Sequence, residues 1–321
     1  MEKSVKEGVL IIDKPQGITS HDVVLMARRS LKIKKIGHIG TLDPLATGVL
    51  PLCIGEATKL SPFLTKQVKE YIATIKFGEE TDTLDSEGKI TFKGEEIPLD
   101  KGKAVGVIQR FKGKLEQVPP IFSAIKKGGV PLYRLARKGV EVEVESREVE
   151  IQEIEVLNLS LPYMTFRVLC SAGTYIRALC RDMGRELKWR GHLTALRRIR
   201  SGSFSIKQSI PFEALQRNES SSIEKRLIPI SSLLEDLPCL EVEKDIEEKV
   251  RRGWQPYLKT LNLPGLKVGG KVRFLSKDGR LISIAEIKDF ETREKDLPLS
   301  TVRDKRGYSD LTFKLLRVFN Y

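Results

Sequence analysis

Cysteine, histidine and long apolar runs are scarce in this chain of 321 residues. It has four cysteines and three histidines, with no Cys-x-x-Cys pair and no spacing typical of metal ligands. A disulfide framework and a zinc site are therefore not indicated, and no metal is expected. The cysteines lie in apolar contexts and are expected to be reduced core residues: Cys53, Cys170, Cys180 and Cys239.

Two further absences narrow the class of protein. No apolar run approaches the ~18 residues of a membrane span, and Met1–Glu7 lacks the apolar core of a signal peptide. We therefore expect a cytoplasmic protein without a membrane partner. The chain also lacks a Gly-x-Ser-x-Gly motif, which argues against a serine hydrolase.

Positive charge, in contrast, is abundant. The sequence holds 56 Lys and Arg against 43 Asp and Glu, giving a formal net charge of +13 and a pI near 9.5. This excess predicts a polyanionic partner, with nucleic acid ahead of an acidic membrane surface. General surface charge is the alternative. Charged residues make up 31% of the chain against about 25% in a typical protein, and part of this excess is also what ion-pair-rich thermal adaptation would produce.

The segment from Gly37 to Pro51 combines three glycines and two prolines around a single acid, Asp43. Glycine permits backbone conformations closed to other residues, and proline fixes one dihedral angle while removing a donor. The mixture predicts a loop of specified geometry that holds the carboxylate of Asp43. A well-packed structural turn is the alternative, because Gly, Pro and Asp are all common turn residues.

Apolar runs and alternation predict strands over residues 8–12, 71–77 and 165–171. Tyr71 opens the second of these and faces inward. A capping-box pattern over Thr19–Asp22 predicts a helix that runs towards Ile33. The acidic turn Thr81–Gly88 lacks the spacing of a calcium loop, and we interpret it as structural.

A helix with an apolar stripe is predicted after Gly173-Thr174. Three arginines share another face of it: Arg177, Arg181 and Arg185. Such a row is typical of a solvated surface, but an arginine in the first turn opposes the helix dipole. An acidic partner would explain Arg177 at this position.

Regular patterns break down between Phe111 and Val149, which indicates a basic insertion, mobile when free. Its aromatic residues lie beside cations, a combination that suits nucleic-acid contacts. The candidates for contact with an RNA backbone are Arg134, Arg137 and Lys138. A solvated loop is the alternative.

The last ~80 residues read as a small basic β-barrel or sandwich, within the size range of a domain. Residues 271–276 and 281–287 flank an Asp278-Gly279 turn, which is a hairpin signature, and further strands are predicted near 311–318. We predict two domains, covering residues 1–238 and 239–321.

A carboxylate on a rigid loop, an inward tyrosine, a helix-start arginine and a basic surface together suggest covalent catalysis on nucleic acid. A carboxylate nucleophile must be ionised and held in position, and a nearby arginine favours both. The residues in these roles are Asp43, Tyr71 and Arg177.

The motif Gly-His-Ile-Gly-Thr-Leu-Asp-Pro-Leu-Ala-Thr-Gly over residues 37–48 resembles the catalytic motif of the TruB family of bacterial tRNA pseudouridine-55 synthases. Further matches lie at residues 13–17, 69–71, 81–85, 133–139 and 173–177, so the resemblance covers nearly the whole chain. Between Ile121 and Val130 the chain departs from the family pattern, and contacts there stay unassigned.

The resemblance implies an α+β pseudouridine synthase fold, with a central mixed, mainly antiparallel sheet and a small PUA-like C-terminal β-barrel. It implies that Asp43 is the nucleophile, that Tyr71 stacks on the flipped base and assists proton transfer, and that Arg177 pairs with Asp43. Three residues would line the nucleotide site: His38, Tyr175 and Leu196. Neither cofactor nor metal is implied.

The same resemblance implies that the protein isomerises uridine 55 in the tRNA T-loop. The insertion would close on the T-loop and T-stem, and the C-terminal domain would contact the acceptor side of the tRNA. We expect a monomer that acts alone. Two alternatives remain at this point: a non-catalytic RNA-binding module or folding factor, and the catalytic subunit of a guide-RNA particle.

Overall fold

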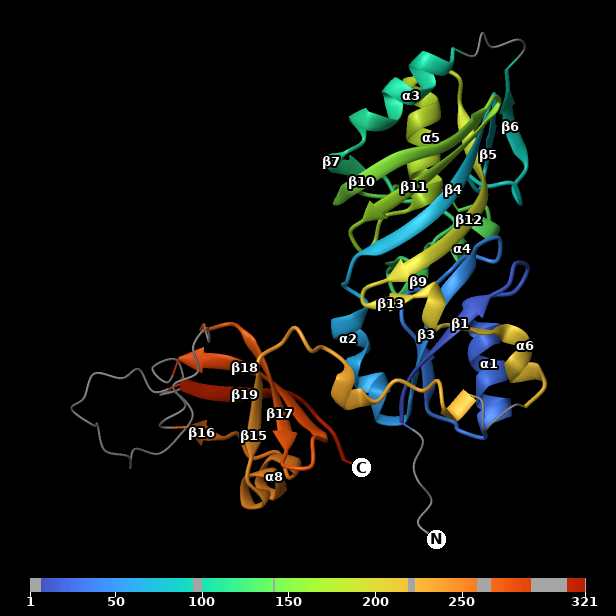
Figure 1. Ribbon diagram of the computed structural model, residues 1–321. Helices are drawn as coiled ribbons and strands as arrows, with labels where there is room; N and C mark the ends of the chain where they lie inside the picture. The colour runs from blue at the N-terminus through green and yellow to red at the C-terminus, as the bar shows by residue number, and fades with distance from the viewer. Residues whose placement is uncertain are drawn as a thin grey trace. The chain divides into compact units, whose positions relative to one another are not determined.

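The computed structural model describes residues 7–94, 100–140, 142–218, 223–258, 267–289 and 311–320 (Figure 1). The chain divides into two compact units. The first consists of Leu10–Leu52 and Pro62–Arg226, and the second of residues 7–9 and 53–61 with the described residues from Leu227 onward. Residues 1–6, on which the expectation about a signal peptide partly rests, lie outside the described residues. Of the helices in the described ranges, none is long and apolar enough to cross a membrane.

A ten-stranded mixed sheet forms the centre of the larger part of the chain, in the order β14-β1-β3-β12-β4-β11-β10-β7, with β13 on β12 and β2 on β3. Pairing is parallel for β1 with β14 and β12 with β3, and antiparallel from β12 through β4, β11 and β10 to β7. The expectation of a mixed sheet is therefore confirmed. The strands are β1 (Gly8–Lys14), β2 (Ile36–His38), β3 (Thr47–Ile54), β4 (Lys69–Phe77), β7 (Gly113–Gln117), β10 (Arg147–Ser160), β11 (Tyr163–Cys170), β12 (Gly191–Ser201), β13 (Phe204–Ser205) and β14 (Ile210–Pro211).

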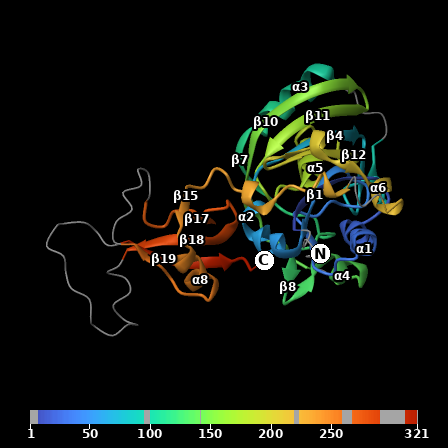
Figure 2. The ribbon, with the colours of Figure 1, turned by 60° about the horizontal axis from the view of Figure 1, so that its bottom comes forward.

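Short elements surround this sheet. Two hairpins pair β5 (Glu79–Thr81) with β6 (Ile90–Lys93) and β8 (Lys126–Lys127) with β9 (Val130–Pro131). The helices are α1 (Ser20–Leu31), α2 (Ser61–Leu64), α3 (Lys101–Arg110), α4 (Leu132–Arg137), α5 (Ile176–Glu186), α6 (Phe212–Gln216) and α8 (Lys244–Arg251), with 3-10 turns at Gly55–Leu60, Ile206–Gln208 and Ile230–Ser232. Helices α1 and α6 lie side by side (Figure 2).

Local sequence signals account for several of these elements. Thr19 caps α1, and its side chain and that of Asp22 exchange hydrogen bonds with each other's backbone N–H, which confirms the predicted capping box. Strand β4 alternates as expected: Tyr71, Ala73 and Ile75 are buried, so the prediction of an inward Tyr71 is also confirmed. Because β4 pairs with both β11 and β12, Tyr71 lies in the middle of the sheet.

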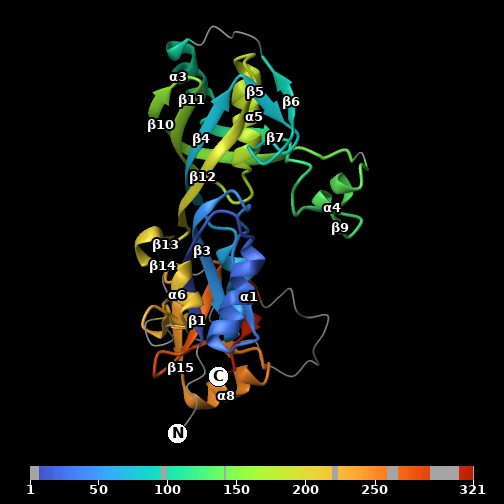
Figure 3. The ribbon, with the colours of Figure 1, turned by 90° about the vertical axis from the view of Figure 1, so that its right-hand side faces the viewer.

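The segment predicted as an insertion over residues 111–149 is shorter than expected. Its ends belong to the central sheet, because β7 and the start of β10 pair in antiparallel register. The sequence does not reveal these strands because their outward residues are charged. What leaves the sheet is residues 118–146, here called the off-sheet segment, and Figure 3 shows its α4 and β9 standing away from the strands.

The second unit contains a five-stranded sheet in the order β15-β17-β18-β19-β16. Its strands are β15 (Cys239–Val242), β16 (Tyr257–Leu258), β17 (Lys271–Ser276), β18 (Leu281–Asp289) and β19 (Leu311–Val318). Strands β17 and β18 are antiparallel, so the predicted hairpin is confirmed. Phe274 and Phe313 pack edge to face in the core, with ring centroids 5.3 Å apart. Among the described residues, these pairings form an open sheet from β15 to β16 and do not close it, so the expected β-barrel is not confirmed.

The cysteines are free, and Cys53, Cys170 and Cys180 are buried as expected. Burial raises the pKa of both Cys53 and Cys170 to about 12, which keeps these thiols protonated and unreactive. The expectation is wrong for Cys239, which is exposed. In β15 the residues alternate, and Leu240 takes the inward position next to it.

Candidate active site

The loop that carries Asp43 is anchored on both sides of that residue. On one side, the Ser20 hydroxyl accepts a hydrogen bond from the Leu42 N–H at 2.8 Å and donates to the Leu42 carbonyl at 3.0 Å. On the other, the Pro44 carbonyl accepts from the Gly17 N–H at 2.9 Å and from Lys14 Nζ at 3.3 Å. These anchors hold the backbone of Asp43 in place, as a positioned carboxylate requires.

Arg198 also holds this loop, through hydrogen bonds to backbone carbonyls. Its side chain is 1% exposed and donates to the carbonyls of Val49 at 2.7 Å and Gly40 at 2.9 Å. Gly48 has φ +100°, and a Cβ there would lie 2.2 Å from the carbonyl oxygen of Arg198. Only glycine therefore allows β3 and β12 to approach so closely at this point.

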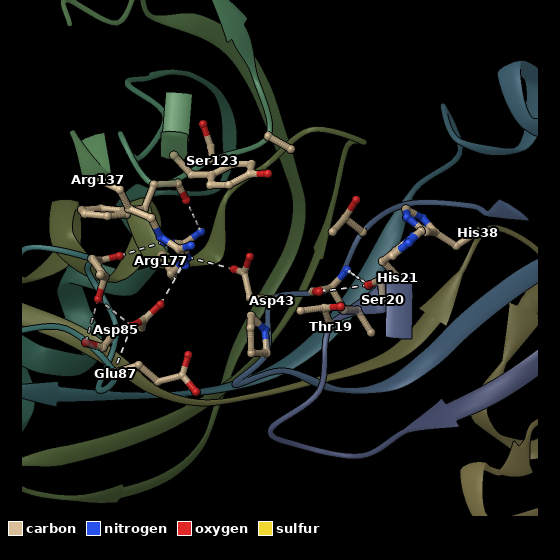
Figure 4. Close-up of a pocket in the computed structure, with 17 residues that line it drawn as sticks. Thr19, Ser20, His21, His38, Asp43, Asp85, Glu87, Ser123, Arg137 and Arg177 are labelled. Atoms are coloured by element: carbon tan, nitrogen blue, oxygen red, sulfur yellow. Dashed lines mark hydrogen bonds and ion pairs between the residues drawn. The ribbon is translucent and has the colours of Figure 1, made fainter. Parts of the chain in front are cut away.

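Arg177 is the hub of the site (Figure 4). It is 4% exposed, and its Nε donates to Asp43 Oδ2 at 2.9 Å. The two terminal nitrogens donate to the carbonyls of Thr83 at 2.8 Å and Phe122 at 2.9 Å. One guanidinium therefore joins the Asp43 loop, the acidic turn and the off-sheet segment. A guanidinium presents donors in a fixed planar fork, which suits this three-way role.

The acidic turn contributes a second carboxylate. Asp85 is buried, and its Oδ2 lies 3.6 Å from Arg177 Nε. Its Oδ1 accepts from the Thr83 hydroxyl at 2.6 Å and from the Glu87 N–H at 3.1 Å. The turn is structural, as interpreted from sequence, but it also supplies Arg177 with an acidic neighbour. Asp85 was given no role of its own from the sequence, although the Thr-Asp-Thr-Leu-Asp run could have marked it as a candidate.

The arginines of α5 differ in exposure. Arg181 is 9% exposed and donates to the Val118 carbonyl at 3.1 Å, so the interpretation of the row as a solvated face is wrong for it. Arg177 was excepted from that interpretation, and it has the acidic partner expected for it. Arg185 is exposed and forms a two-bond ion pair with Glu80. The off-sheet segment covers this face of the helix over its first two turns. Helical periodicity shows which residues share a face but not that another segment covers it.

Two cavities meet at Asp43, one of about 260 Å³ and one of about 580 Å³. The smaller is lined by Tyr71, Tyr175 and Leu196, together with Asp43 and Arg177. The structure thus brings together five of the residues singled out from sequence.

The larger cavity extends from Asp43 to the start of α1. It is lined by His38 and by Arg137 of α4, so two more of the expected site residues lie here. Arg134 and Lys138 line neither cavity and are exposed. The guanidiniums of Arg134 and Arg137 lie 6.0 and 5.7 Å from the ring centroid of Tyr133.

Several cations of the described residues are buried close to Asp43, and each of them donates to backbone carbonyls. Lys14 donates to Pro15 and Pro44, and Lys69 donates to Thr65 and Gln67. Arg177 and Arg198 have been described above. Burial lowers the pKa of Lys14 and of Lys69 to about 8 in each case. Sequence reasoning missed Lys14, Lys69 and Arg198, although Arg198 follows Leu196 at strand spacing and so shares its inward face.

Burial also shapes the aromatic groups of the site. It raises the pKa of Tyr71, so the phenol stays protonated at neutral pH, and Arg198 opposes the shift. Burial lowers the pKa of His38, with further lowering by Arg198 and His21, so its imidazole is neutral near pH 7. The Nδ1 atom of His38 is buried and has no hydrogen-bond partner among the described residues.

Metal chemistry has no obvious donor set in this region. Within the residues that the structure describes, no three His, Cys, Asp or Glu side chains are grouped so as to hold a metal ion. The site is instead a fixed carboxylate beside a guanidinium, facing one pocket with two tyrosines and one with a neutral imidazole. Such a site can present a nucleophile to a flat, neutral ring.

Solved structures with the same fold include an H/ACA RNP bound to a substrate RNA containing 2'-deoxyuridine, with a TM-score of 0.71 at 23% identity, covering 99% of this chain and 86% of that chain. The archaeal box H/ACA sRNP Nop10-Cbf5 complex gives a TM-score of 0.70 at 24% identity, covering 98% and 86%. The fold is therefore the pseudouridine synthase fold.

The sequence matches two family models in succession. The N-terminal domain of TruB family pseudouridylate synthases matches residues 28–176, and the C-terminal domain of tRNA pseudouridylate synthase B matches residues 177–235. The tRNA pseudouridine synthase B of Geobacter sulfurreducens is 43% identical over 284 residues, which cover 87% of this chain and 93% of that protein. That of Syntrophus aciditrophicus is 42% identical over 283 residues, covering 87% and 90%. The chain belongs to the TruB family of tRNA pseudouridine synthases.

Proposed function

We propose that this protein isomerises uridine 55 in the T-loop of tRNA, acting alone and without a cofactor, with Asp43 as the nucleophile. Family membership makes it a tRNA pseudouridine synthase, an isomerase. The observation that carries the rest is the carboxylate of Asp43, held by Arg177 at the junction of two cavities. A nucleophile must be reachable from the substrate side and fixed from the protein side, and Asp43 meets both conditions.

The reaction exchanges one glycosidic bond for another. The bond from ribose C1′ to uracil N1 breaks, the ring turns, and a bond from C1′ to C5 forms; C5 loses a proton and N1 gains one. Attack by Asp43 at ribose C1′ or at ring C6 uses the same ionised carboxylate. Arg177 orients that carboxylate through the ion pair between its Nε and Asp43 Oδ2 at 2.9 Å.

The smaller cavity is proposed to receive the flipped uracil. A base must leave its stack before a carboxylate can reach it, at a cost of a few kcal/mol, and contacts to the flipped base offset part of this cost. Tyr71 would stack on the ring, and Tyr175 and Leu196 would line its edge. His38, whose Nδ1 has no hydrogen-bond partner among the described residues, would contact the nucleotide from the larger cavity.

We further propose that residues 1–238 form the catalytic domain and 239–321 a PUA-like RNA-binding domain. In support, the family matches end at residue 235, and the sheet of the second unit begins with β15 at Cys239. The first domain would engage the T-loop and T-stem, and the second the acceptor side. A monomer working on tRNA in the cytoplasm fits this division.

Incubation of the purified chain with an unmodified tRNA transcript tests the function. We expect pseudouridine at position 55 and at no other position, with no added RNA or protein. The site of modification is read by carbodiimide labelling and primer extension. An inactive chain that becomes active with a guide RNA would contradict stand-alone action, and tight binding without turnover would favour an RNA-binding module.

Tyr71→Phe should keep the stacking ring and lose the proton-transfer group. We expect the single-turnover rate to fall by about 10²- to 10⁴-fold, the usual contribution of a general acid or base. Tyr163→Phe is the control, because Tyr163 lies exposed on the neighbouring strand β11. Equal rates for the two variants would remove Tyr71 from proton transfer.

Replacing Arg134, Arg137 and Lys138 by glutamine should weaken tRNA binding and flatten its salt dependence. Each lost phosphate contact reduces the slope of log K against log[salt] by about 0.7 to 0.9. Filter binding at several salt concentrations measures this slope. The matched control removes three exposed cations from α3: Lys101, Lys103 and Arg110. Equal slopes for the two triple variants would count against RNA contacts by the off-sheet segment.

A further inference from the structure

The two ends of the off-sheet segment meet at one point of the central sheet. Strand β7 ends at Gln117 and β10 begins at Arg147, and these two residues are partners in the antiparallel register. The chain therefore leaves the sheet and returns to it side by side. Both residues also contact the short loop that leads into α5.

Gln117 holds the backbone of Tyr175. Its side chain is fully buried; Nε2 donates to the Tyr175 carbonyl at 3.1 Å, and Oε1 accepts from the Tyr175 N–H at 2.8 Å. Tyr175 is the N-cap residue of α5, and its own side chain makes no capping hydrogen bond. A buried amide with both of its groups bonded to one residue fixes the conformation of that residue. Gln117 thus sets where the helix that carries Arg177 begins.

Arg147 holds the ring of the same tyrosine. The carbon of its guanidinium lies 4.7 Å from the ring centroid of Tyr175, within the range of a cation–π contact. The guanidinium also donates to the carbonyl of Gly173. Because Gly173 and Tyr175 line the smaller cavity, Arg147 fixes a wall of that cavity from outside it.

We propose that Gln117 and Arg147 are positioning residues that clamp Tyr175, and with it the start of α5, in the geometry that the flipped nucleotide requires. The clamp rests on the function proposed above, but neither residue lines a cavity at Asp43. The off-sheet segment begins and ends at the clamp. RNA contacts along that segment therefore affect the position of Tyr175 through these two side chains. The clamp thereby couples engagement of the T-loop to the shape of the uracil pocket.

Amide exchange in the free protein tests the first half of the clamp. In Gln117→Leu the Tyr175 N–H loses its acceptor, and we expect its exchange to accelerate by about tenfold or more, while amides in β4 exchange as in the wild type. Gln117→Glu keeps an acceptor for the N–H and loses the donor to the carbonyl, so its exchange should fall between the two. The readout does not depend on turnover.

Single-turnover kinetics at saturating enzyme test the second half. Arg147→Met should lower the rate by about tenfold, the size expected for one cation–π contact, but should have a much smaller effect in a Tyr175→Ala background, where only its hydrogen bond to the Gly173 carbonyl is left to lose. The control is Glu148→Gln on the same strand, an exposed residue paired with Lys114, which should leave the rate unchanged.

The outcomes separate the clamp from the proposed function. A wild-type protein that leaves tRNA unmodified overturns the function, and the exchange result then still decides the contact of Gln117 with Tyr175. An active wild type with unchanged Tyr175 exchange in Gln117→Leu, or with additive effects of Arg147→Met and Tyr175→Ala, overturns the clamp. If Gln117→Leu does not fold, Gln117→Glu and Arg147→Met decide by the same measures.

Discussion

Asp43→Asn should abolish pseudouridine formation and leave tRNA binding nearly intact. An amide fills the same space and can still accept a hydrogen bond from Arg177, but it is not a nucleophile. We expect the single-turnover rate to fall by about 10⁵-fold or more, as when a catalytic nucleophile is removed. Affinity should change by less than about threefold, because phosphate contacts dominate it.

Asp82→Asn is the matched control for this variant. Asp82 is exposed in the acidic turn, accepts from the Lys89 N–H at 2.8 Å, and can do so equally as an asparagine. The two variants change net charge identically. Measurable turnover by Asp43→Asn at a rate comparable to Asp82→Asn would refute the role of Asp43 as nucleophile, whatever the effect on binding.

Arg177→Met should damage both stability and catalysis. The substitution leaves Asp85 buried beside an apolar side chain and frees two backbone carbonyls. Removing one partner of a buried ion pair costs about 3 to 5 kcal/mol of unfolding free energy. The rate should fall by about 10²-fold or more, because Asp43 loses the group that orients it. Denaturant unfolding and single-turnover kinetics measure the two effects.

Arg185→Met is the control on the same helix. Its side chain is 47% exposed and pairs with Glu80 at the surface, so its loss should cost no more than about 1 kcal/mol. Adding Asp85→Asn to Arg177→Met should recover part of the lost stability, because it removes the uncompensated buried charge. Equal destabilisation by Arg177→Met and Arg185→Met would show that the buried contacts of Arg177 stabilise the fold no more than a surface ion pair does.

Local patterns predicted the elements that present the site. The capping box at Thr19 and the alternation of β4 each depend on residues close together in sequence. For such features the backbone conformation is largely set by neighbours, so periodicity and turn chemistry suffice. The hairpin of β17 and β18 was predictable for the same reason. The loop predicted over residues 37–51 is shorter than expected, because its two ends belong to β2 and β3.

The residues that hold the site were harder to predict, because their partners are backbone groups far along the chain. Arg198 donates to Val49, and Gln117 to Tyr175, and no side-chain pattern marks a carbonyl as an acceptor. Strand β12 also contains register shifts between Leu193 and Ala195 and after Arg198, which interrupt simple alternation. In addition, Lys, Arg and Gln are mostly exposed in folded proteins, so an isolated one in the sequence is expected on the surface.

The buried cations beside Asp43, Lys14, Lys69, Arg177 and Arg198, have a consequence for how salt should act on the enzyme. They are fixed by carbonyls before RNA arrives, and buried charges are screened much less than exposed ones. The exposed cations Arg134, Arg137 and Lys138 of the off-sheet segment have no such protection. Raising the ionic strength should therefore increase KM steeply and leave kcat almost constant. Binding of tRNA would then depend on salt, and the chemical step would not.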